Sequence, residues 1–288
     1  MKVAAIDIGS NSMRLLIVER IGDGEVELGR YERVTGLGIG VDATGVLTEE
    51  AIDRTLLALS EFGGRMEKIG VDRRRAVATS ASRDASNRET FFDRAELALG
   101  VRPELIPGER EADLSFRGAT TGMPFSGPFL VIDIGGGSTE FTTADGGRSF
   151  DIGSVRLTDR VLNARPAPPG QLAEARGLVG EMFLPISTFV GRVVGVAGTW
   201  TSLQRIENPE TETHLASLSA MQVSALVDRL AKLSVDETAA LPGLDPARAP
   251  VILSGAVVAE AALAACGANA VTISEHDLLD GVVAELLG

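Results

Sequence analysis

The stretch VAAIDIGSNSMRLLI, residues 3–17, decides the fold, because FLVIDIGGGSTEF, residues 129–141, repeats its pattern. Each stretch starts with an apolar run, reaches Asp-Ile-Gly, passes through small polar residues and resumes as a second run. An apolar run that breaks at glycine and then resumes predicts two strands joined by a tight hairpin. Asp7 and Asp133 are 126 residues apart, about one domain length. The repeat therefore predicts a duplicated α/β unit.

Around the first stretch, the residue pattern predicts three strands, at 3–9, 13–21 and 25–34. A glycine-rich loop follows at 35–45. Thr48 is the expected N-cap of a helix that ends near Gly70, with Glu49 and Glu50 in its first turn. A strand at 75–79, a helix, a strand near Leu105 and a helix from about Glu109 complete the first domain.

The turn-rich segment TGMPFSG, residues 121–127, predicts a boundary between domains 1–122 and 123–288. The second domain is expected to contain a hairpin with a Gly-Gly turn in TTADGGRSF, residues 142–150, and strands within 192–198 and 270–274. The last helix, within 275–287, can return to dock on the first domain.

The amino-acid composition indicates a globular protein and argues against one that binds nucleic acid or a membrane. Of 288 residues, 44% are hydrophobic and 23% are charged, which is typical of a globular protein with a buried core. The first apolar run breaks at Asp7, so it predicts a strand rather than a signal peptide, and we expect a cytoplasmic protein. The net charge of −13 argues against nucleic-acid or membrane binding. The single cysteine, Cys266, lies in an apolar helical run and is expected in the core.

The two glycine turns have the chemistry of anion sites. Successive N–H groups at such turns can surround an anion, and Ser10, Asn11, Ser12, Ser138 and Thr139 add hydroxyl and amide donors. Asp7 and Asp133, at the strand ends, can hold Mg²⁺ through water. A plain hairpin with a capping aspartate explains either turn alone, but two similar turns one domain apart favour the phosphate site.

Several segments resemble known families. DIGSNSMRLLI and DIGGGSTEF resemble the two phosphate loops of actin-like ATPases, and GVAGTWTSL, residues 195–203, resembles the third glycine motif of that superfamily. ATSASRDASN (78–87), PGEREADLSFRGA (107–119) and EHDLLDGVVAELL (275–287) resemble segments of exopolyphosphatase/guanosine-pentaphosphatase (Ppx/GppA) enzymes, in the same order. The resemblance implies an α/β fold with two actin-like (ribonuclease-H-like) domains flanking a cleft.

The resemblance also implies roles for individual residues. Glu111 aligns with the catalytic base and Glu140 with a second catalytic carboxylate, while Asp7 and Asp133 remain the metal candidates. The candidate phosphate-binding residues are Ser10, Asn11, Ser12, Arg83, Asn87, Gly135, Gly136, Gly137, Ser138, Thr139, Gly198 and Thr199. Without the resemblance, we would expect Glu111 and Arg83 to be ordinary surface residues.

The implied activity is Mg²⁺- or Mn²⁺-dependent hydrolysis of the terminal phosphate of inorganic polyphosphate. Guanosine pentaphosphate is the alternative substrate. A weakly catalytic protein that binds polyphosphate or guanosine tetraphosphate is the alternative from another class. A sugar or acetate kinase is disfavoured, because no acceptor pocket or catalytic aspartate is found in the first domain. A homodimer is compatible with the sequence.

Three departures from the family pattern bear on substrate choice. Arg110 stands where the family often has a glutamate, which predicts a changed preference for substrate charge. Trp200, in the third glycine motif, either fills the space of an adenine or belongs to the core. The helical domain of longer relatives has no counterpart here, so we expect a preference for short polyphosphate.

Overall fold

The computed structural model describes residues 1–288 and divides into two compact units. Unit 1 consists of Met1–Gly118 and His276–Gly288, and unit 2 of Ala119–Glu275. The last helix is therefore part of unit 1. The predicted domain boundary at residues 122 and 123 lies close to this junction.

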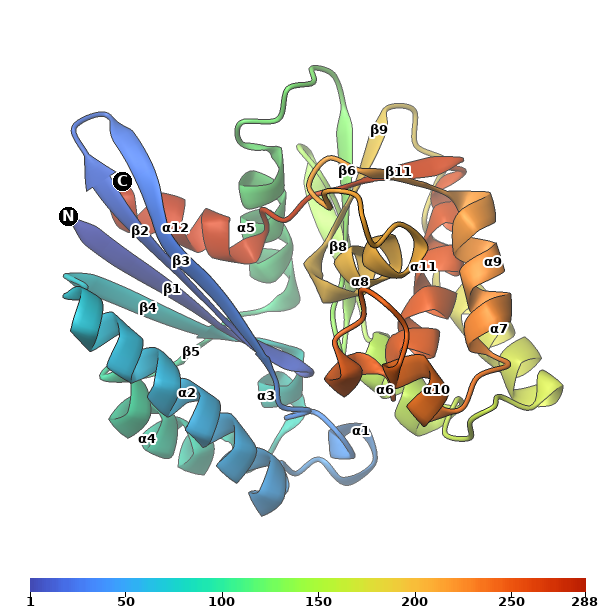
Figure 1. Cartoon of the computed structure of the whole chain (residues 1–288), viewed down its shortest axis with the longest axis horizontal. Helices are drawn as coiled ribbons and strands as arrows, with labels where there is room; N and C mark the ends of the chain where they lie inside the picture. The colour runs from blue at the N-terminus through green and yellow to red at the C-terminus, as the bar shows by residue number, and fades with distance from the viewer. The chain divides into compact units, whose positions relative to one another are not determined.

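Unit 1 contains a 5-stranded sheet in the order β3-β2-β1-β4-β5 (Figure 1). Its strands are β1 (Lys2–Ile8), β2 (Ser12–Ile21), β3 (Gly24–Val34), β4 (Arg73–Ala78) and β5 (Glu104–Leu105). The first three strands form an antiparallel meander, and β4 runs parallel to β1 and β5. The three strands predicted from the opening stretch are confirmed.

The helices of unit 1 are α1 (Val41–Thr44), α2 (Glu49–Ile69), α3 (Ser80–Asp84), α4 (Arg88–Leu99), α5 (Gly108–Thr120) and α12 (Leu278–Leu287). Thr48 caps α2, since its hydroxyl accepts a hydrogen bond from the Ala51 N–H. Gly70 ends the helix with a φ of 74°, a left-handed conformation that favours glycine. The predicted helix between Thr48 and Gly70 is thus confirmed at both ends.

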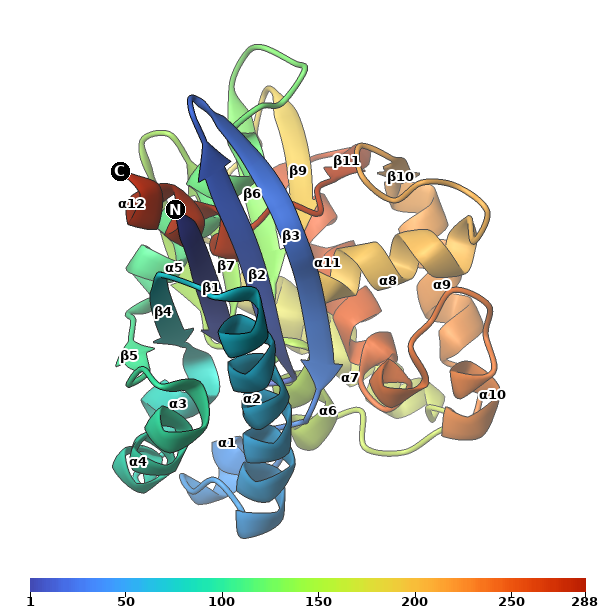
Figure 2. The same cartoon turned by 60° about the vertical axis from the view of Figure 1, so that its left-hand side comes forward.

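Helices cover both faces of this sheet. The side chains of β1 alternate: Ile6 and Ile8 pack with Phe62 of α2, whereas Val3 and Ala5 pack with residues of α12. In both views α12 lies beside β1 and β2 (Figures 1 and 2). The apolar run at the N-terminus is continuous because both of its faces are buried.

Glycines allow α5 and α12 to cross closely. A Cβ at Gly118 of α5 would lie 1.8 Å from the carbonyl oxygen of Asp277, and a Cβ at Gly281 of α12 would lie 2.2 Å from that of Leu114. Any side chain at either position would push the helices apart.

Unit 2 contains a 6-stranded sheet in the order β10-β11-β9-β6-β7-β8. Its strands are β6 (Phe129–Ile134), β7 (Thr139–Thr143), β8 (Gly146–Phe150), β9 (Arg192–Val196), β10 (Ser217–Ser219) and β11 (Ala270–Ile273). The β7–β8 hairpin corrects one prediction: Ala144 and Asp145 form its turn, and Gly146 already pairs with Thr143. The Gly-Gly pair therefore lies at the start of β8 instead of in the turn.

The helices of unit 2 are α6 (Ser154–Arg160), α7 (Pro169–Met182), α8 (Ala197–Glu207), α9 (Ala220–Leu230), α10 (Val235–Ala239) and α11 (Ile252–Cys266), with a 3₁₀ turn η1 (Pro246–Arg248). Helix α11 is apolar on most sides and lies in the core, in contact with α6, α7, α8 and α9. Cys266, at its end, is fully buried, and burial raises the pKa of its thiol. No helix combines the length and the apolar character that a membrane span requires.

Candidate active site

The loop between β1 and β2 directs its carbonyl groups towards the glycine-rich segment that follows β3. The Ser10 carbonyl accepts a hydrogen bond from Gly38 N at 2.7 Å, and the Asn11 carbonyl accepts from Thr35 N and Gly36 N, both at 2.9 Å. The N–H groups of Ser10 and Asn11 have no hydrogen-bond acceptor within the chain. A buried N–H group without a partner is rare in folded proteins, so this loop has the form of an anion site.

The loop between β6 and β7 is built in the same way. The Gly135 carbonyl accepts from Ser154 N at 3.0 Å, and the Gly136 carbonyl accepts from Val155 N at 2.8 Å. The Gly137 carbonyl accepts from Arg156 Nε at 2.8 Å. The N–H groups of Gly136 and Gly137 have no acceptor within the chain. The carbonyl groups of this loop therefore accept hydrogen bonds from the start of α6, while the N–H groups of Gly136 and Gly137 can bind a ligand.

The two hairpins match in detail. Gly9 N donates to the Ser12 carbonyl at 3.1 Å, and Gly135 N donates to the Ser138 carbonyl at 3.0 Å. Asn11 adds a side-chain donor in unit 1, since its Nδ2 is buried and has no partner. The duplicated sequence pattern thus corresponds to a duplicated nest of N–H donors.

Asp7 lies at the end of β1 and is 5% exposed. Its Oδ2 accepts hydrogen bonds from Nε and Nη2 of Arg14, at 2.9 and 2.6 Å, while its Oδ1 is buried without a partner. Burial raises the pKa of the Asp7 carboxyl, and the positive charge of Arg14 opposes that rise without cancelling it. Asp7 therefore presents one unpaired oxygen.

In unit 2 the corresponding positions carry two carboxylates. Asp133, at the end of β6, is paired in register with Glu140 of β7, and both are buried, with exposed fractions of 6% and 1%. Like charges directly across a strand pair repel each other, and a cation near both carboxylates relieves that repulsion. Glu140 is oriented by β8, since its Oε1 accepts a hydrogen bond from the Ser149 hydroxyl at 2.6 Å.

Glu111 lies in the first turn of α5 and is 8% exposed. Its Oε2 accepts a hydrogen bond from Arg83 Nη1 at 2.8 Å, and the same nitrogen donates to the Ile106 carbonyl at 3.0 Å. The candidate base and the candidate phosphate-binding arginine are thus in direct contact. This pairing gives Glu111 a fixed orientation in a buried position.

Some predicted phosphate ligands have structural partners. Asn87 forms two hydrogen bonds with the backbone of Leu47, both at 2.9 Å. The Thr139 hydroxyl donates to the Ile152 carbonyl at 2.6 Å, and the Ser10 hydroxyl accepts from Ala81 N at 3.0 Å. These side chains secure the loops, whereas Ser12 begins β2 and Ser138 lies in the loop before β7.

The third glycine motif begins α8. Gly198 and Thr199 are in its first turn, directly after Ala197, which has a φ of 70°. This left-handed conformation favours glycine, so alanine is strained there. The buried Arg248 covers Gly198, where a Cβ would lie 2.2 Å from the guanidinium nitrogens.

Trp200 is a core residue. It is fully buried, its Nε1–H donates to the Ile132 carbonyl at 3.0 Å, and its ring packs against Gly195. Of the two predicted alternatives for Trp200, these contacts therefore support the core residue and not the one that fills the space of an adenine.

Arg110 has partners on its own helix and on α12. It donates to Asp113 at 2.6 Å and to Glu285, which also accepts from Arg75 at 2.7 Å. Burial alone would raise the pKa of Glu285, but the hydrogen bonds from Arg75 and Arg110 outweigh it and lower that pKa. Arg110 thus fastens α12 to α5, and its predicted effect on substrate charge has no support in these contacts.

Sequence reasoning missed several residues of this arrangement. Arg14 follows Asp7 by the same interval that separates Glu140 from Asp133, so the repeat itself could have identified it. Ser149, Arg248 and Asp277 had no such signal, because each is defined by a contact with a distant segment.

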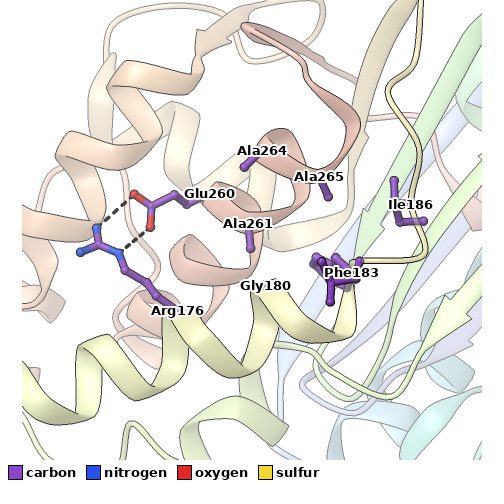
Figure 3. A pocket seen from close by; sticks show the side chains of 9 residues that line it. Arg176, Gly180, Phe183, Ile186, Glu260, Ala261, Ala264 and Ala265 are labelled. Atoms are coloured by element: carbon purple, nitrogen blue, oxygen red, sulfur yellow. Dashed lines mark hydrogen bonds and ion pairs between the residues drawn. The ribbon is translucent and has the colours of Figure 1, made fainter.

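A cavity of about 580 Å³ in unit 2 contains none of the predicted site residues (Figure 3). It lies along α7 and α11, with Phe183 and small residues on its wall and the Arg176–Glu260 ion pair at one end. Arg176 also pairs with Asp228 at 3.0 Å. Because its cation is already neutralised, this cavity does not suit a polyanion.

The donor set suits Mg²⁺ better than a fully protein-coordinated metal. No three side chains among His, Cys, Asp and Glu lie close enough to form a metal site by themselves. Mg²⁺ usually keeps several waters and binds through one or two carboxylates together with substrate phosphates. The unpaired Oδ1 of Asp7 in unit 1 fits that requirement, and so, separately, does the Asp133–Glu140 pair in unit 2.

Known proteins share both the sequence and the fold. Exopolyphosphatase 2 of Mycobacterium tuberculosis is 38% identical over 315 residues, covering 100% of this chain and 99% of that protein. The crystal structure of an exopolyphosphatase-like protein has a TM-score of 0.94 at 36% identity, covering 100% of this chain and 99% of the other. An exopolyphosphatase from Cytophaga hutchinsonii has a TM-score of 0.90 at 29% identity, covering 100% and 98%.

These similarities confirm the α/β fold with two actin-like (ribonuclease-H-like) units. The family model for the Ppx/GppA phosphatases matches residues 17–288. The chain therefore belongs to the Ppx/GppA phosphatase family and is a phosphohydrolase.

Proposed function

We propose that this protein is an exopolyphosphatase, which hydrolyses the terminal phosphoanhydride bond of inorganic polyphosphate with Mg²⁺ or Mn²⁺ as cofactor. The observation that carries the proposal is the duplicated loop. In both units, carbonyl groups of the loop in the first hairpin accept hydrogen bonds from a later segment, whereas two consecutive N–H groups have no acceptor: those of Ser10 and Asn11 in unit 1 and of Gly136 and Gly137 in unit 2. The names of the similar exopolyphosphatases support polyphosphate as the substrate.

The loops supply charge stabilisation. Phosphoryl transfer to water needs neutralised oxygens and a positioned nucleophile more than covalent chemistry. N–H donors that are already oriented require no reorganisation when negative charge develops on the phosphoryl oxygens. Ser10, Asn11, Gly136 and Gly137 provide such donors.

Glu111 is the proposed general base. Its carboxylate is buried and held by Arg83, so it can take a proton from the attacking water in a fixed direction. Glu140, oriented by Ser149, is the proposed second carboxylate. Arg83 has a guanidinium that can bind both Glu111 and a phosphate oxygen, because the group carries several N–H donors.

The proposed metal ligands are Asp7 in unit 1 and Asp133 in unit 2. When bound, Mg²⁺ neutralises charge on the phosphate oxygens. A protein with a net charge of −13 repels a polyanion. We therefore expect activity to vanish in a chelator and to return with Mg²⁺ or Mn²⁺.

The decisive experiment measures phosphate release from short polyphosphate, long polyphosphate, guanosine pentaphosphate and ATP, each with and without Mg²⁺. We expect Mg²⁺-dependent release, highest with short polyphosphate. Faster release from guanosine pentaphosphate would assign the chain to nucleotide hydrolysis instead. Tight binding of polyphosphate or guanosine tetraphosphate without turnover would make it a binding protein.

Chain-length preference has its own test. Each bound phosphate needs a nearby cation, because salt screens exposed charges over about 8 Å. Because the protein has a net charge of −13, we expect it to prefer short substrates. We also expect it to shorten long chains distributively, which would be visible as a ladder of intermediates. Loss of long chains without intermediates, at a higher kcat/KM than for short ones, would refute this preference; a channel completed in a homodimer would explain that result.

A further inference from the structure

Arg14 lies between two buried carboxylates that come from opposite ends of the chain. On one side it donates two hydrogen bonds to Oδ2 of Asp7. On the other side its Nη1 donates to Oδ2 of Asp277, a residue 263 positions later in the sequence. Asp7 and Asp277 are 5% and 4% exposed, and the side chain of Arg14 between them is 15% exposed, so both carboxylates are shielded from solvent.

Asp277 cannot turn away from Arg14, because its other groups are engaged. It is the N-cap of α12: its Oδ1 accepts from Leu279 N at 3.0 Å, and its own N–H donates to Asp280 Oδ2 at 2.8 Å. Asp280 in turn receives two hydrogen bonds from Arg30, at 2.7 and 3.1 Å. The helix cap therefore fixes the far end of Arg14.

The contacts of Arg14 decide which oxygen of Asp7 is available. Both bonds from Arg14 go to Oδ2, and Oδ1 is left buried without a partner. Asp7 and Arg14 are partners in register on β1 and β2, so the guanidinium is held beside the carboxylate. Rotation of the Asp7 carboxylate would break two charge-assisted hydrogen bonds.

The matching position in unit 2 shows that this neighbour is not required by the hairpin. Asp133 has Glu140 as its partner in register, where Asp7 has Arg14. The hairpin itself thus does not require an arginine at this position, because the matching position in unit 2 carries a glutamate.

We infer that Arg14 and Asp277 are positioning residues that hold Oδ1 of Asp7 towards the divalent cation. The inference rests on the proposed metal role of Asp7. Partners that orient a metal ligand typically contribute 10- to 100-fold to metal affinity or activity. The last helix, through its cap, thereby completes a site at the beginning of the chain.

The test compares the full-length protein with Asp277→Asn and Arg14→Lys. Asparagine can still cap α12, but its amide nitrogen cannot accept a hydrogen bond from Arg14. Lysine keeps the charge but lacks the planar fork that makes two parallel bonds. Glu285→Gln is the matched control, because it removes the ion pairs with Arg75 and Arg110 at the other end of the same helix, away from Asp7.

Two measurements separate positioning from stability. Mn²⁺ binding to the substrate-free protein, followed by electron paramagnetic resonance, is expected to weaken about 10- to 100-fold in both variants. The Mg²⁺ concentration that gives half-maximal hydrolysis of short polyphosphate should rise in the same proportion, and saturating Mg²⁺ should restore part of the kcat. Glu285→Gln should lower only the melting temperature.

Unchanged Mn²⁺ affinity in folded Asp277→Asn and Arg14→Lys would overturn the inference, as would a wild-type protein that binds no Mn²⁺. If the wild type bound Mn²⁺ but hydrolysed no polyphosphate, the proposed function would fail. The binding comparison would still decide the role of Arg14 and Asp277.

Discussion

Arg83 Nη1 lies 2.8 Å from Oε2 of Glu111, which joins the candidate phosphate-binding arginine to the candidate base. The two come from α3 and from the first turn of α5, and their side chains are 20% and 11% exposed. In this position Arg83 can orient Glu111, and in the proposed mechanism it can also contact the phosphate.

Glu111→Gln should reduce kcat on the order of 10²–10⁴-fold, because an amide cannot take a proton from water. Binding should persist, since the variant removes a negative charge that repels the polyanion. Steady-state kinetics on short polyphosphate and equilibrium binding measure the two effects. A near-normal kcat would show that another group acts as base.

Arg83→Ala should lower kcat/KM by about one to two decades, which corresponds to one charge-assisted hydrogen bond of roughly 1.5–3 kcal/mol. Arg94→Ala is the control, since Arg94 pairs with Glu49 and Asp53 on the surface of the same unit. In the double variant with Glu111→Gln, the two losses should combine to less than their product, because the residues are in contact. Fully independent losses would contradict the pairing.

Ser149→Ala should lower kcat about tenfold with little change in KM, because the hydroxyl of Ser149 orients Glu140 at 2.6 Å. Ser217→Ala, at another exposed strand position of unit 2, should have no effect. Glu140→Gln should show a larger loss than Ser149→Ala. If Ser149→Ala matched the wild type, the hydrogen bond would have no part in catalysis.

Gly118→Ala should destabilise the protein by about 1–3 kcal/mol, because the new methyl group would overlap the Asp277 carbonyl and push α12 away. In an open helical position the same change should stabilise by up to about 1 kcal/mol. Gly64→Ala in α2 is such a position, with nothing within 4 Å of the added Cβ. Urea unfolding measures the change in the free energy of unfolding for both variants. Equal changes would show that α5 and α12 can move apart without a loss of stability.

The ion pairs of Glu285 should make stability depend on pH. Its pKa is lowered in the folded protein, so its contribution is present above the pKa of the unfolded chain, about 4.3. That contribution is lost as the pH falls through the lower folded value. The melting temperature of Glu285→Gln should therefore be about 2–4 °C below that of the wild type at pH 7, for a loss of roughly 1 kcal/mol. The difference should shrink as the pH falls below about 4.3 and disappear once the pH is below the lowered folded pKa; a constant difference would exclude a charge effect.

The local elements could be predicted because short segments determine them. Thr48 and Gly70 bound a helix through interactions within a few residues of each other. The Asp-Ile-Gly repeat predicted both hairpins because glycine and alternating apolar residues specify a strand and turn over about ten positions. The Gly-Gly turn was wrong by two residues, since nothing local distinguishes it from the neighbouring Ala-Asp turn.

By itself the sequence determined that the chain has two α/β hairpin units of one kind and that small residues and an aspartate stand at each loop. Only the tertiary structure decided that Arg14 would hold Asp7 and be held by Asp277. It also decided that Trp200 would lie in the core and that Arg110 would pair with Glu285 of α12. The physical reason is that these contacts join segments far apart in the chain, and their geometry depends on how whole helices and sheets pack rather than on any local pattern.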